Sequence, residues 1–195
     1  NIVLKIVSAI SKETKIKNLC MAGGVALNCV ANGKILKEKI FDNIWIQPAA
    51  GDAGGSLGAA LALWYLDQGN KRTVNPEDDM AGSYLGPEFS QDQIEQELKS
   101  LGANYEILNY ENLIEKTSDY LSKEKAIGWF QGRMEFGPRA LGGRSILGDP
   151  RSEKMQKNLN LKVKYRESFR PFAPSVLNED LTRWFDMNVD SPYML

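Results

Sequence analysis

Helical and strand-like patterns alternate along the first 69 residues, and this alternation constrains the fold more than any other feature of the sequence. Residues 1–14 carry apolar side chains on one helical face, and residues 25–39 and 51–69 also favour helices. Between them lie two short apolar runs, 16–24 and 41–50, which are typical of buried strands. The order helix, strand, helix, strand, helix predicts an α/β fold, in which helices cover the faces of a sheet.

Each predicted strand runs into a glycine-rich turn. The first turn lies in MAGGVALN (21–28), and the second lies in PAAGDAGGSLGAAL (48–61). Ligands of α/β sheets usually bind beyond the carboxyl ends of the strands, where both turns would lie. Glycines such as Gly23 and Gly24 let backbone N–H groups approach a nucleotide closely, although a tight turn that binds nothing has the same composition.

Asp52 is the acidic residue of the second turn. Its carboxylate can bind a metal ion or a ribose hydroxyl, or it can cap the following helix by accepting a bond from a backbone N–H. The neighbouring glycines, Gly54, Gly55 and Gly58, can admit a bulky ligand or allow close packing of helix against sheet. The residues alone leave these alternatives open.

Polar residues 70–83 lack periodicity and contain Pro and Gly, which predicts a linker and a domain boundary. Beyond this linker, Ser90 followed by Gln93 forms a capping-box pattern and predicts the start of a helix. The remaining elements are expected as a strand at 103–108, a helix at 111–123, a strand at 125–132, a helix at 155–163, an extended segment at 170–177 and a helix at 178–185 capped by Asn178.

The charge balance of the chain restricts its partners and its chemistry. The chain has 195 residues, of which 24 are Lys or Arg and 25 are Asp or Glu, so no general nucleic-acid coat is expected. The chain contains no histidine, which removes the commonest general base and the commonest metal ligand. Catalysis must therefore use carboxylates, Lys, Arg, Ser, backbone groups or a metal with oxygen ligands.

The cysteines bear on the cellular compartment of the protein, and the two ends of the sequence bear on whether it is a fragment. Cys20 and Cys29 have neither the spacing of a zinc site nor the number needed for a disulfide framework, so we expect buried free thiols in a reducing cytoplasm. Residues 1–10 are apolar but too short to cross a membrane, and no secretory signal is present. The chain begins without Met and both ends look like cuts, which predicts a fragment of a longer protein.

The stretch QGRMEFGPRALGGRSIL (131–147) crowds several anion-binding residue types together and has no clean helical or strand period. It contains three arginines, a carboxylate and a hydroxyl: Arg133, Arg139, Arg144, Glu135 and Ser145. The planar fork of arginine suits phosphate and carboxylate oxygens, and Glu135 can orient one of the arginines. Anion binding is the leading interpretation, and a buried structural network of ion pairs is the alternative.

A second basic cluster lies in KYRESFRPFAPS (164–175), which contains Lys164, Arg166, Arg170 and Ser175. If these residues are helical, Arg166 and Arg170 share a face; if they are extended, Lys164, Arg166 and Arg170 share one. Either arrangement points two basic groups in the same direction. The two clusters together predict a two-sided cationic pocket for a triphosphate or an acyl phosphate.

These four stretches, in this order, resemble the NodU/CmcH-type carbamoyltransferases, which O-carbamoylate sugars and antibiotics. The resemblance covers roughly residues 19–195. It implies that residues 1–75 are the C-terminal part of an actin-like ATPase domain of the sugar-kinase type, and that residues 76–83 are a linker. It further implies that residues 84–195 form a YrdC-like domain that makes carbamoyl adenylate and is incomplete at its C-terminus.

The resemblance also implies a reaction and its partners. Carbamoyl phosphate and ATP would yield a carbamoyl adenylate, with magnesium as an optional companion of ATP, and the carbamoyl group would pass to a hydroxyl of a small molecule. A metal, expected to be iron, would be held by histidines and aspartates, of which the histidine pair belongs to an N-terminal region that this sequence lacks. That region is the expected partner, a homo-oligomer is left open, and no nucleic acid or membrane is expected.

Site residues follow by matching positions to the motifs of that family. The residues expected to act in catalysis are Lys164, Arg166 and Arg139. The residues expected to bind substrate or nucleotide are Arg133, Arg144, Arg170, Ser145, Ser175, Gly23, Gly24 and Asn28. Asp52 matches the metal-binding aspartate. Two rival hypotheses are an actin-like kinase or ATPase for another substrate, and a non-catalytic nucleotide-binding module whose arginines form structural ion pairs.

Overall fold

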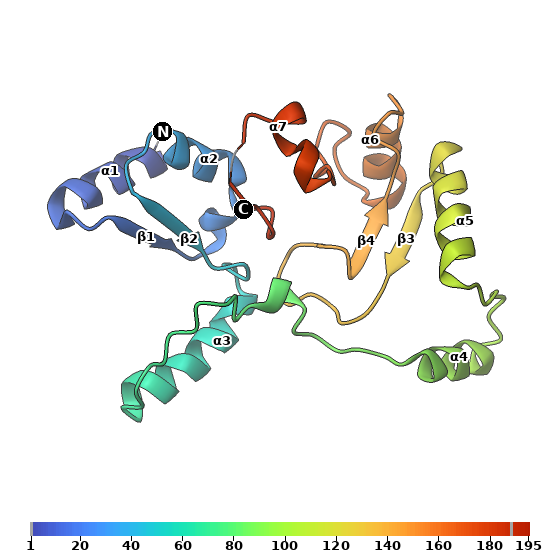
Figure 1. Cartoon of the computed structure of the whole chain (residues 1–195), viewed down its shortest axis with the longest axis horizontal. Coiled ribbons are helices and arrows are strands. Elements are labelled where there is room, and N and C mark those ends of the chain that lie inside the picture. The colour runs from blue at the N-terminus through green and yellow to red at the C-terminus, as the bar shows by residue number, and fades with distance from the viewer. Residues whose placement is uncertain (1, 188) are drawn as a thin grey trace. The chain divides into compact units, whose positions relative to one another are not determined.

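The computed structural model describes residues 2–187 and 189–195, which form two compact units (Figure 1). The first unit contains the chain up to Gly86, the segment Glu135–Leu141 and the C-terminal residues Ser191–Leu195. The second unit contains Pro87–Met134 and Gly142–Asp190. The mixture of helices and small sheets confirms the α/β class, whereas the domain bounds expected at 75, 76–83 and 84 stay a prediction.

Helices and strands alternate in the first unit as predicted. Its elements are α1 (Ile2–Thr14), β1 (Asn18–Met21), the 3-10 turn η1 (Gly24–Leu27), α2 (Cys29–Lys37), β2 (Asn43–Ile46), α3 (Ala53–Ala62), the π-helical turn η2 (Leu63–Asp67) and the 3-10 turn η3 (Ala81–Ser83). The α-helix expected from residue 25 begins only at Cys29. The reason is Asn28, whose side chain accepts a bond of 3.1 Å from the Ala31 amide and so caps α2.

The strands β1 and β2 are parallel neighbours, with Leu19 opposite Ile44 in the register. The core of this unit consists of Val7, Ile35 and Phe41, against which Leu19 and Ile44 pack. Alternate residues of a strand point to opposite faces of the sheet. The other face of this sheet carries exposed side chains.

Free thiols are confirmed, because neither Cys20 nor Cys29 forms a disulfide, but the expectation that they are buried is wrong. Cys20 lies on the exposed face of the sheet, and Cys29 begins α2 with an exposed side chain. The cause is the period of two along β1, which places Leu19 rather than Cys20 against the core.

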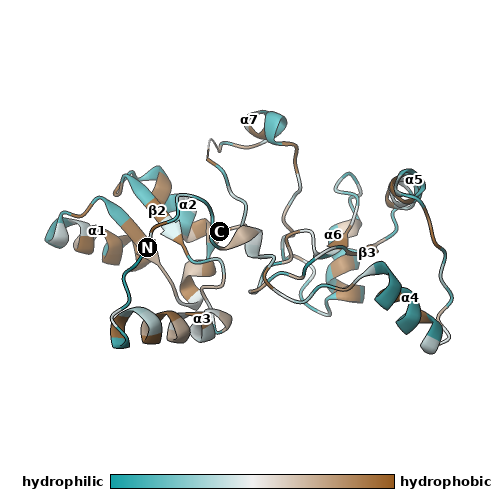
Figure 2. Cartoon of the chain, turned by 60° about the horizontal axis from the view of Figure 1, so that its bottom comes forward, coloured by the Kyte–Doolittle hydropathy of each residue, from teal (hydrophilic) through white to brown (hydrophobic). Residues whose placement is uncertain are grey.

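Apolar residues dominate α3, as Figure 2 shows, yet none of its side chains is buried among the described residues. The same holds for η2, where Leu66 is 83% exposed. A helix that is hydrophobic all round is the kind that other elements usually cover. Among residues 2–187 and 189–195, no helix is both long and apolar enough to span a bilayer.

The second unit is built around an antiparallel pair of short strands. Its elements are α4 (Gln91–Ser100), α5 (Tyr110–Ser122), β3 (Ile127–Phe130), β4 (Arg144–Leu147), α6 (Met155–Asn158), the π-helical turn η4 (Leu159–Val163), the 3-10 turn η5 (Asn178–Asp180) and α7 (Leu181–Trp184). In the register, Ile127 lies opposite Leu147 and Phe130 lies opposite Arg144. The capping box of α4 is present as predicted, with Ser90 and Gln93 bonded in both directions.

Three local expectations for this unit are wrong. Residues 103–108 form no strand in the described structure, because they have no hydrogen-bonded neighbouring strand there. Conversely, the arginine stretch contains β4, although its sequence has no clean strand period. The cap expected at Asn178 is absent, since that residue lies inside η5 and Leu177 occupies the position before it.

Candidate functional site

The two glycine turns of the first unit lie side by side at the carboxyl ends of β1 and β2. The amide of Gly23 donates a hydrogen bond of 2.7 Å to the carbonyl oxygen of Ala50. Leu27 reaches the second turn as well, because its side chain would lie 3.7 Å from a Cβ on Gly51. The sheet therefore brings both turns to the edge where the alternating pattern placed them.

Gly23 adopts a φ of +93°, a backbone conformation that favours glycine. A Cβ at Gly23 or at Gly24 would meet open space in the part of the chain that the structure describes. Both backbones are thus accessible to a ligand. Asn28, by contrast, already has a structural task, since its side-chain oxygen caps α2.

Asp52 precedes α3 with an exposed side chain. It makes no capping bond to that helix, so the capping alternative is wrong. Within the described residues, no group of three or more His, Cys, Asp or Glu side chains could hold a metal ion. Asp52 can supply one ligand, but the described side chains do not by themselves fit an iron or magnesium centre.

Gly54 is required for packing. A Cβ at this position would lie 2.1 Å from the carbonyl oxygen of Ala49, far inside contact distance. Gly55 and Gly58 face open space among the described residues. The close-packing interpretation therefore holds for Gly54 alone of these three glycines.

Residues 135–141 of the arginine stretch belong to the first unit. Glu135 is 4% exposed and accepts a bond of 2.7 Å from the amide of Leu141, which closes the segment 135–141 into a loop. The amide of Phe136 donates to the Ser83 carbonyl at 2.6 Å, so the loop is anchored at η3. Glu135 thus shapes the backbone around Arg139.

Arg139 lies beside the first glycine turn. One of its terminal nitrogens donates a bond of 2.7 Å to the carbonyl oxygen of Leu27. Its Nε atom is buried and has no hydrogen-bond partner among the described residues. A buried donor without a partner is costly, so this nitrogen is available to an additional acceptor.

The other predicted residues of this stretch belong to the second unit. Arg133 pairs with Glu88 at 3.3 Å, and both side chains are about half exposed. Arg144 begins β4, and the hydroxyl of Ser145 accepts a bond of 3.0 Å from the amide of Gly142. The stretch is therefore divided between the two units, and the predicted two-sided pocket stays a prediction.

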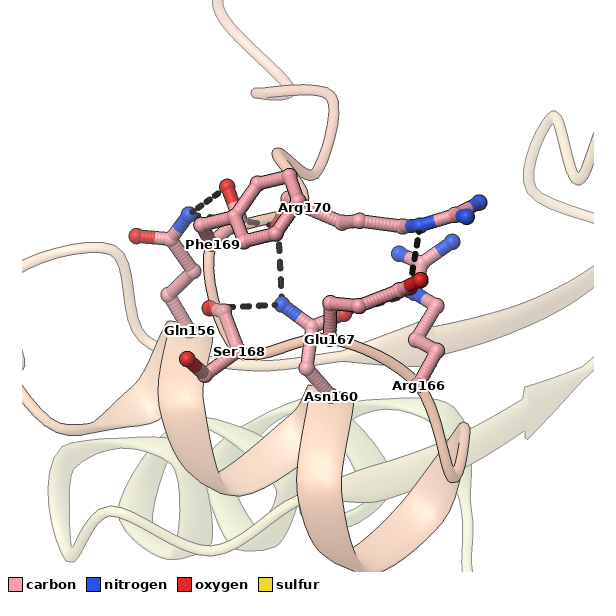
Figure 3. A network of polar contacts seen from close by, with 7 residues as sticks. All are labelled: Gln156, Asn160, Arg166, Glu167, Ser168, Phe169 and Arg170. Carbon is pink, nitrogen blue, oxygen red and sulfur yellow. Dashed lines mark hydrogen bonds and ion pairs between the residues drawn. The ribbon is translucent and has the colours of Figure 1, made fainter.

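The second basic cluster forms a tight turn at the end of η4 (Figure 3). Arg166 donates from Nε to the side-chain oxygen of Asn160 at 2.6 Å, and its guanidinium lies 4.9 Å from the centre of the Phe172 ring. Arg170 donates from Nε to Glu167 at 2.7 Å. The turn is neither helical nor a strand, so neither predicted face describes how these side chains meet.

Lys164 and Ser175 are the other predicted site residues of this stretch of sequence. The ammonium group of Lys164 is exposed and contacts no partner among residues 2–187 and 189–195. Ser175 is exposed in the segment 170–177, which forms neither helix nor strand, and its extended conformation stays a prediction. The pKa of Glu167 lies below its ordinary value, because its own backbone amide and then Arg170 stabilise the carboxylate.

Sequence reasoning missed Asn160, which is fully buried, and Asp149, which is nearly so. Asp149 accepts bonds from the guanidinium and the amide of Arg151, and these bonds hold its pKa below the ordinary value. Asn160 could have been found as a polar residue within the apolar run MQKNLNLKV (155–163). Its partners, however, come from a turn whose conformation the local pattern does not specify.

Comparison with known proteins decides the family. The model of the carbamoyltransferase N-terminus matches residues 1–61, and that of the carbamoyltransferase C-terminus matches residues 118–195. The chain belongs to the carbamoyltransferase family. The resemblance read from its motifs is therefore confirmed.

Several relatives of this carbamoyltransferase chain are known. An uncharacterized protein of Synechocystis sp. is 57% identical over 196 residues, which covers 100% of this chain and 32% of the relative. Nodulation protein NolNO of Sinorhizobium fredii is 45% identical over 178 residues, or 91% of the chain and 26% of the relative. Nodulation protein U of Rhizobium fredii is 34% identical over 179 residues, which covers 92% of this chain and 28% of the relative. The chain thus spans about a third, or less, of the length of these relatives.

Proposed function

We propose that the whole enzyme is an O-carbamoyltransferase. It uses carbamoyl phosphate and ATP to form a carbamoyl adenylate, and it transfers the carbamoyl group to a hydroxyl of a sugar or an antibiotic-like small molecule. The observation that carries this proposal is the turn after η4, which contains Arg166 and Arg170 and begins directly after Lys164 in the sequence. Membership of the carbamoyltransferase family supports the group that is transferred.

The fold proposal divides the sequence at the predicted linker, residues 76–83. We assign residues 1–75 to the C-terminal part of an actin-like ATPase domain, and residues 84–195 to a YrdC-like adenylate-forming domain. The parallel pair β1 and β2, with glycine turns at their carboxyl ends, supports the first assignment. The cationic turn and the strand pair β3 and β4 are the features of the second assignment.

Adenylate formation suits a chain without histidine. In a balanced reaction, hydrolysis of carbamoyl phosphate releases phosphate and leaves carbamate, and a carbamate oxygen then displaces pyrophosphate from the α-phosphorus of ATP. Negative charge gathers on phosphate oxygens in both steps, and fixed guanidinium groups stabilise that charge without a histidine base. Lys164 and Arg166 are the proposed catalytic cations of the turn. Arg170, Arg133, Arg144, Ser145 and Ser175 are proposed to bind phosphate and substrate oxygens.

The first unit is proposed to bind the adenylate for transfer. The accessible backbones of Gly23 and Gly24 support nucleotide binding there, with Asn28 at the end of the same turn. Arg139 completes this proposed site, because its unpartnered Nε lies beside that turn. Asp52 is proposed as one ligand of a metal whose other ligands lie outside the described residues, and a magnesium ion would accompany ATP.

Lys164→Ala in the whole enzyme tests the adenylation proposal. We expect carbamoyl-phosphate-dependent exchange of pyrophosphate into ATP to fall by at least about a hundredfold, because one oxyanion-stabilising donor is removed. Lys162→Ala is the matched control, since Lys162 is an exposed lysine two residues earlier, inside η4, and it should retain exchange. Near-normal exchange in the Lys164 variant would overturn the assignment.

The transferred group can be identified by mass. Candidate sugars and aminoglycosides incubated with the whole enzyme, carbamoyl phosphate and ATP should gain the mass of one carbamoyl group. A phosphorylated product formed without carbamoyl phosphate would instead show an actin-like kinase. A complete lack of turnover and of nucleotide binding would favour a non-catalytic module.

A further inference from the structure

Asn160 is the centre of a polar network around the cationic turn (Figure 3). The residue is 0% exposed and lies in η4. Its amide nitrogen donates to the carbonyl oxygens of Ser168 at 3.2 Å and Arg170 at 2.8 Å. Its side-chain oxygen accepts from Nε of Arg166 at 2.6 Å. One buried amide therefore touches both the backbone of the turn and one of its cationic side chains.

The burial of Asn160 calls for a reason. A buried amide is tolerated only when its hydrogen bonds are made, since an unpaired one costs roughly 1–3 kcal/mol. Its neighbours Met155 and Leu159 are buried and apolar. The bonds of Asn160 are all directed at the turn 166–170, so its structural effect is concentrated there.

Arg166 is oriented by two neutral contacts. Asn160 fixes the Nε edge of the guanidinium, and Phe172 lies against its plane. The two terminal nitrogens have no hydrogen-bond or ion-pair partner in the described part of the chain. A guanidinium held in this way presents a fixed pair of terminal nitrogens, which matches two oxygens of one phosphate group.

The acceptor of Arg166 differs in kind from that of Arg170. Arg170 bonds to the carboxylate of Glu167, which balances its charge. Asn160 is neutral, so the atom bonded to Arg166 carries no opposing charge, and the Glu167 carboxylate, which pairs with Arg170, acts on Arg166 only through space. An amide in this position therefore keeps the cation available for an anion, whereas a carboxylate would compete with that anion.

We infer that Asn160 is a positioning residue, which fixes the Arg166 guanidinium so that its terminal nitrogens receive a phosphate group. That this phosphate belongs to carbamoyl phosphate or ATP rests on the proposed function. The coupling between the two side chains does not depend on it, since inorganic phosphate presents the same oxygens.

The test measures the affinity of the whole enzyme for inorganic phosphate by titration calorimetry. Arg166→Ala and Asn160→Ala should each weaken phosphate binding by at least about tenfold, the equivalent of one charge-assisted hydrogen bond. The double variant should bind no more weakly than Arg166→Ala, because Asn160 acts through Arg166. Gln156→Ala is the matched control and should bind within about twofold of the unaltered enzyme. Gln156 bonds to the Phe169 and Arg170 carbonyls of the same turn but not to Arg166.

Several outcomes overturn the inference. The first is that Asn160→Ala binds phosphate as tightly as the unaltered enzyme. The second is that Asn160→Ala weakens phosphate binding equally whether Arg166 is present or replaced. The third is that the unaltered enzyme binds no phosphate. Arg166→Lys covers the case in which the Asn160 variant does not fold, since Arg166 is only half-buried. Lysine retains the charge but has no fork for Asn160 and phosphate together, so it should bind as weakly as alanine. Binding of Arg166→Lys equal to that of the unaltered enzyme contradicts the inference.

The proposed function fails separately. If phosphate binding shows the coupling but the unaltered enzyme shows no carbamoyl-phosphate-dependent exchange, the proposed function is wrong and the positioning role stands. If exchange is present and the two side chains are not coupled, the proposed function stands and the positioning role is wrong.

Discussion

Gly54 lies where the first turn of α3 meets the carbonyl oxygen of Ala49. A Cβ there would be 2.1 Å from that oxygen, whereas a Cβ on the adjacent Gly55 would meet open space among the described residues. Two neighbouring glycines with the same helical environment therefore have opposite requirements. The difference depends on one contact to the preceding turn and not on helix propensity.

Gly54→Ala should destabilise the whole enzyme by about 1–3 kcal/mol, because backbone must move to relieve the overlap. Gly55→Ala is the control and should be neutral or stabilising by up to about 1 kcal/mol, since alanine favours a helix over glycine. Denaturant unfolding of both variants checks this prediction. Equal stabilities for the two variants would show that the close approach at Gly54 is not a constraint.

Helix starts in this chain are marked by local side-chain caps. Ser90 and Gln93 form both bonds of a capping box at α4, and Asn109 accepts from the Asn112 amide at the start of α5. Asn28 does the same for α2. Each cap satisfies an amide that the first helical turn leaves unpaired, so these helices begin where their caps lie.

Ser90→Ala should weaken the start of α4 by about 1 kcal/mol, because the Gln93 amide loses its acceptor. Ser100→Ala is the control at the other end of the same helix, where the serine hydroxyl only bonds back to the Glu97 carbonyl. Hydrogen exchange of the amides of residues 91–94 should be faster in the first variant and unchanged in the second. Similar exchange rates in both variants would contradict a capping role.

The reach of sequence reasoning is clearest at the level of elements. The alternation of helices and strands in the first unit and the capping box of α4 were predictable, because apolar spacing and caps are local properties. The strand expected at 103–108 and the strand β4 were not, because a strand exists only with its hydrogen-bonded neighbour. Among the proposed site residues, Arg166 and Lys164 were predicted from their chemistry, whereas Asn160 required the conformation of the turn.

At the scale of the whole molecule, contacts between distant parts of the chain hold each unit together. Tyr193 donates its hydroxyl hydrogen to Asp78 and accepts a bond of 3.0 Å from the Gly82 amide. Burial, and then the bond to Asp78, raise the pKa of Tyr193 to about 12. The Tyr193 hydroxyl in turn holds the pKa of Asp78 below its ordinary value. The C-terminal residues are thereby tied to the first unit.

Tyr193→Phe should lower the melting temperature of the whole enzyme at neutral pH. Because the folded-state pKa of Asp78 is depressed, its contribution is present above the ordinary value of 3.8 and is lost as the pH falls through the folded-state value. The difference between variant and unaltered enzyme should therefore shrink in acid. Melting curves recorded from neutral pH down to pH 3 check this, and a difference that grows in acid would contradict it.

Local features of the sequence determined the α/β class, the glycine turns, the helix caps and the motifs of the carbamoyltransferase family, because each depends on residues close together in the chain. Tertiary structure alone decided that the segment 135–141 joins the first unit and brings Arg139 to the Leu27 carbonyl. It also decided that Asn160 holds Arg166. Such bonds join backbone and side chains across turns and long separations, where apolar periodicity and propensity carry no information.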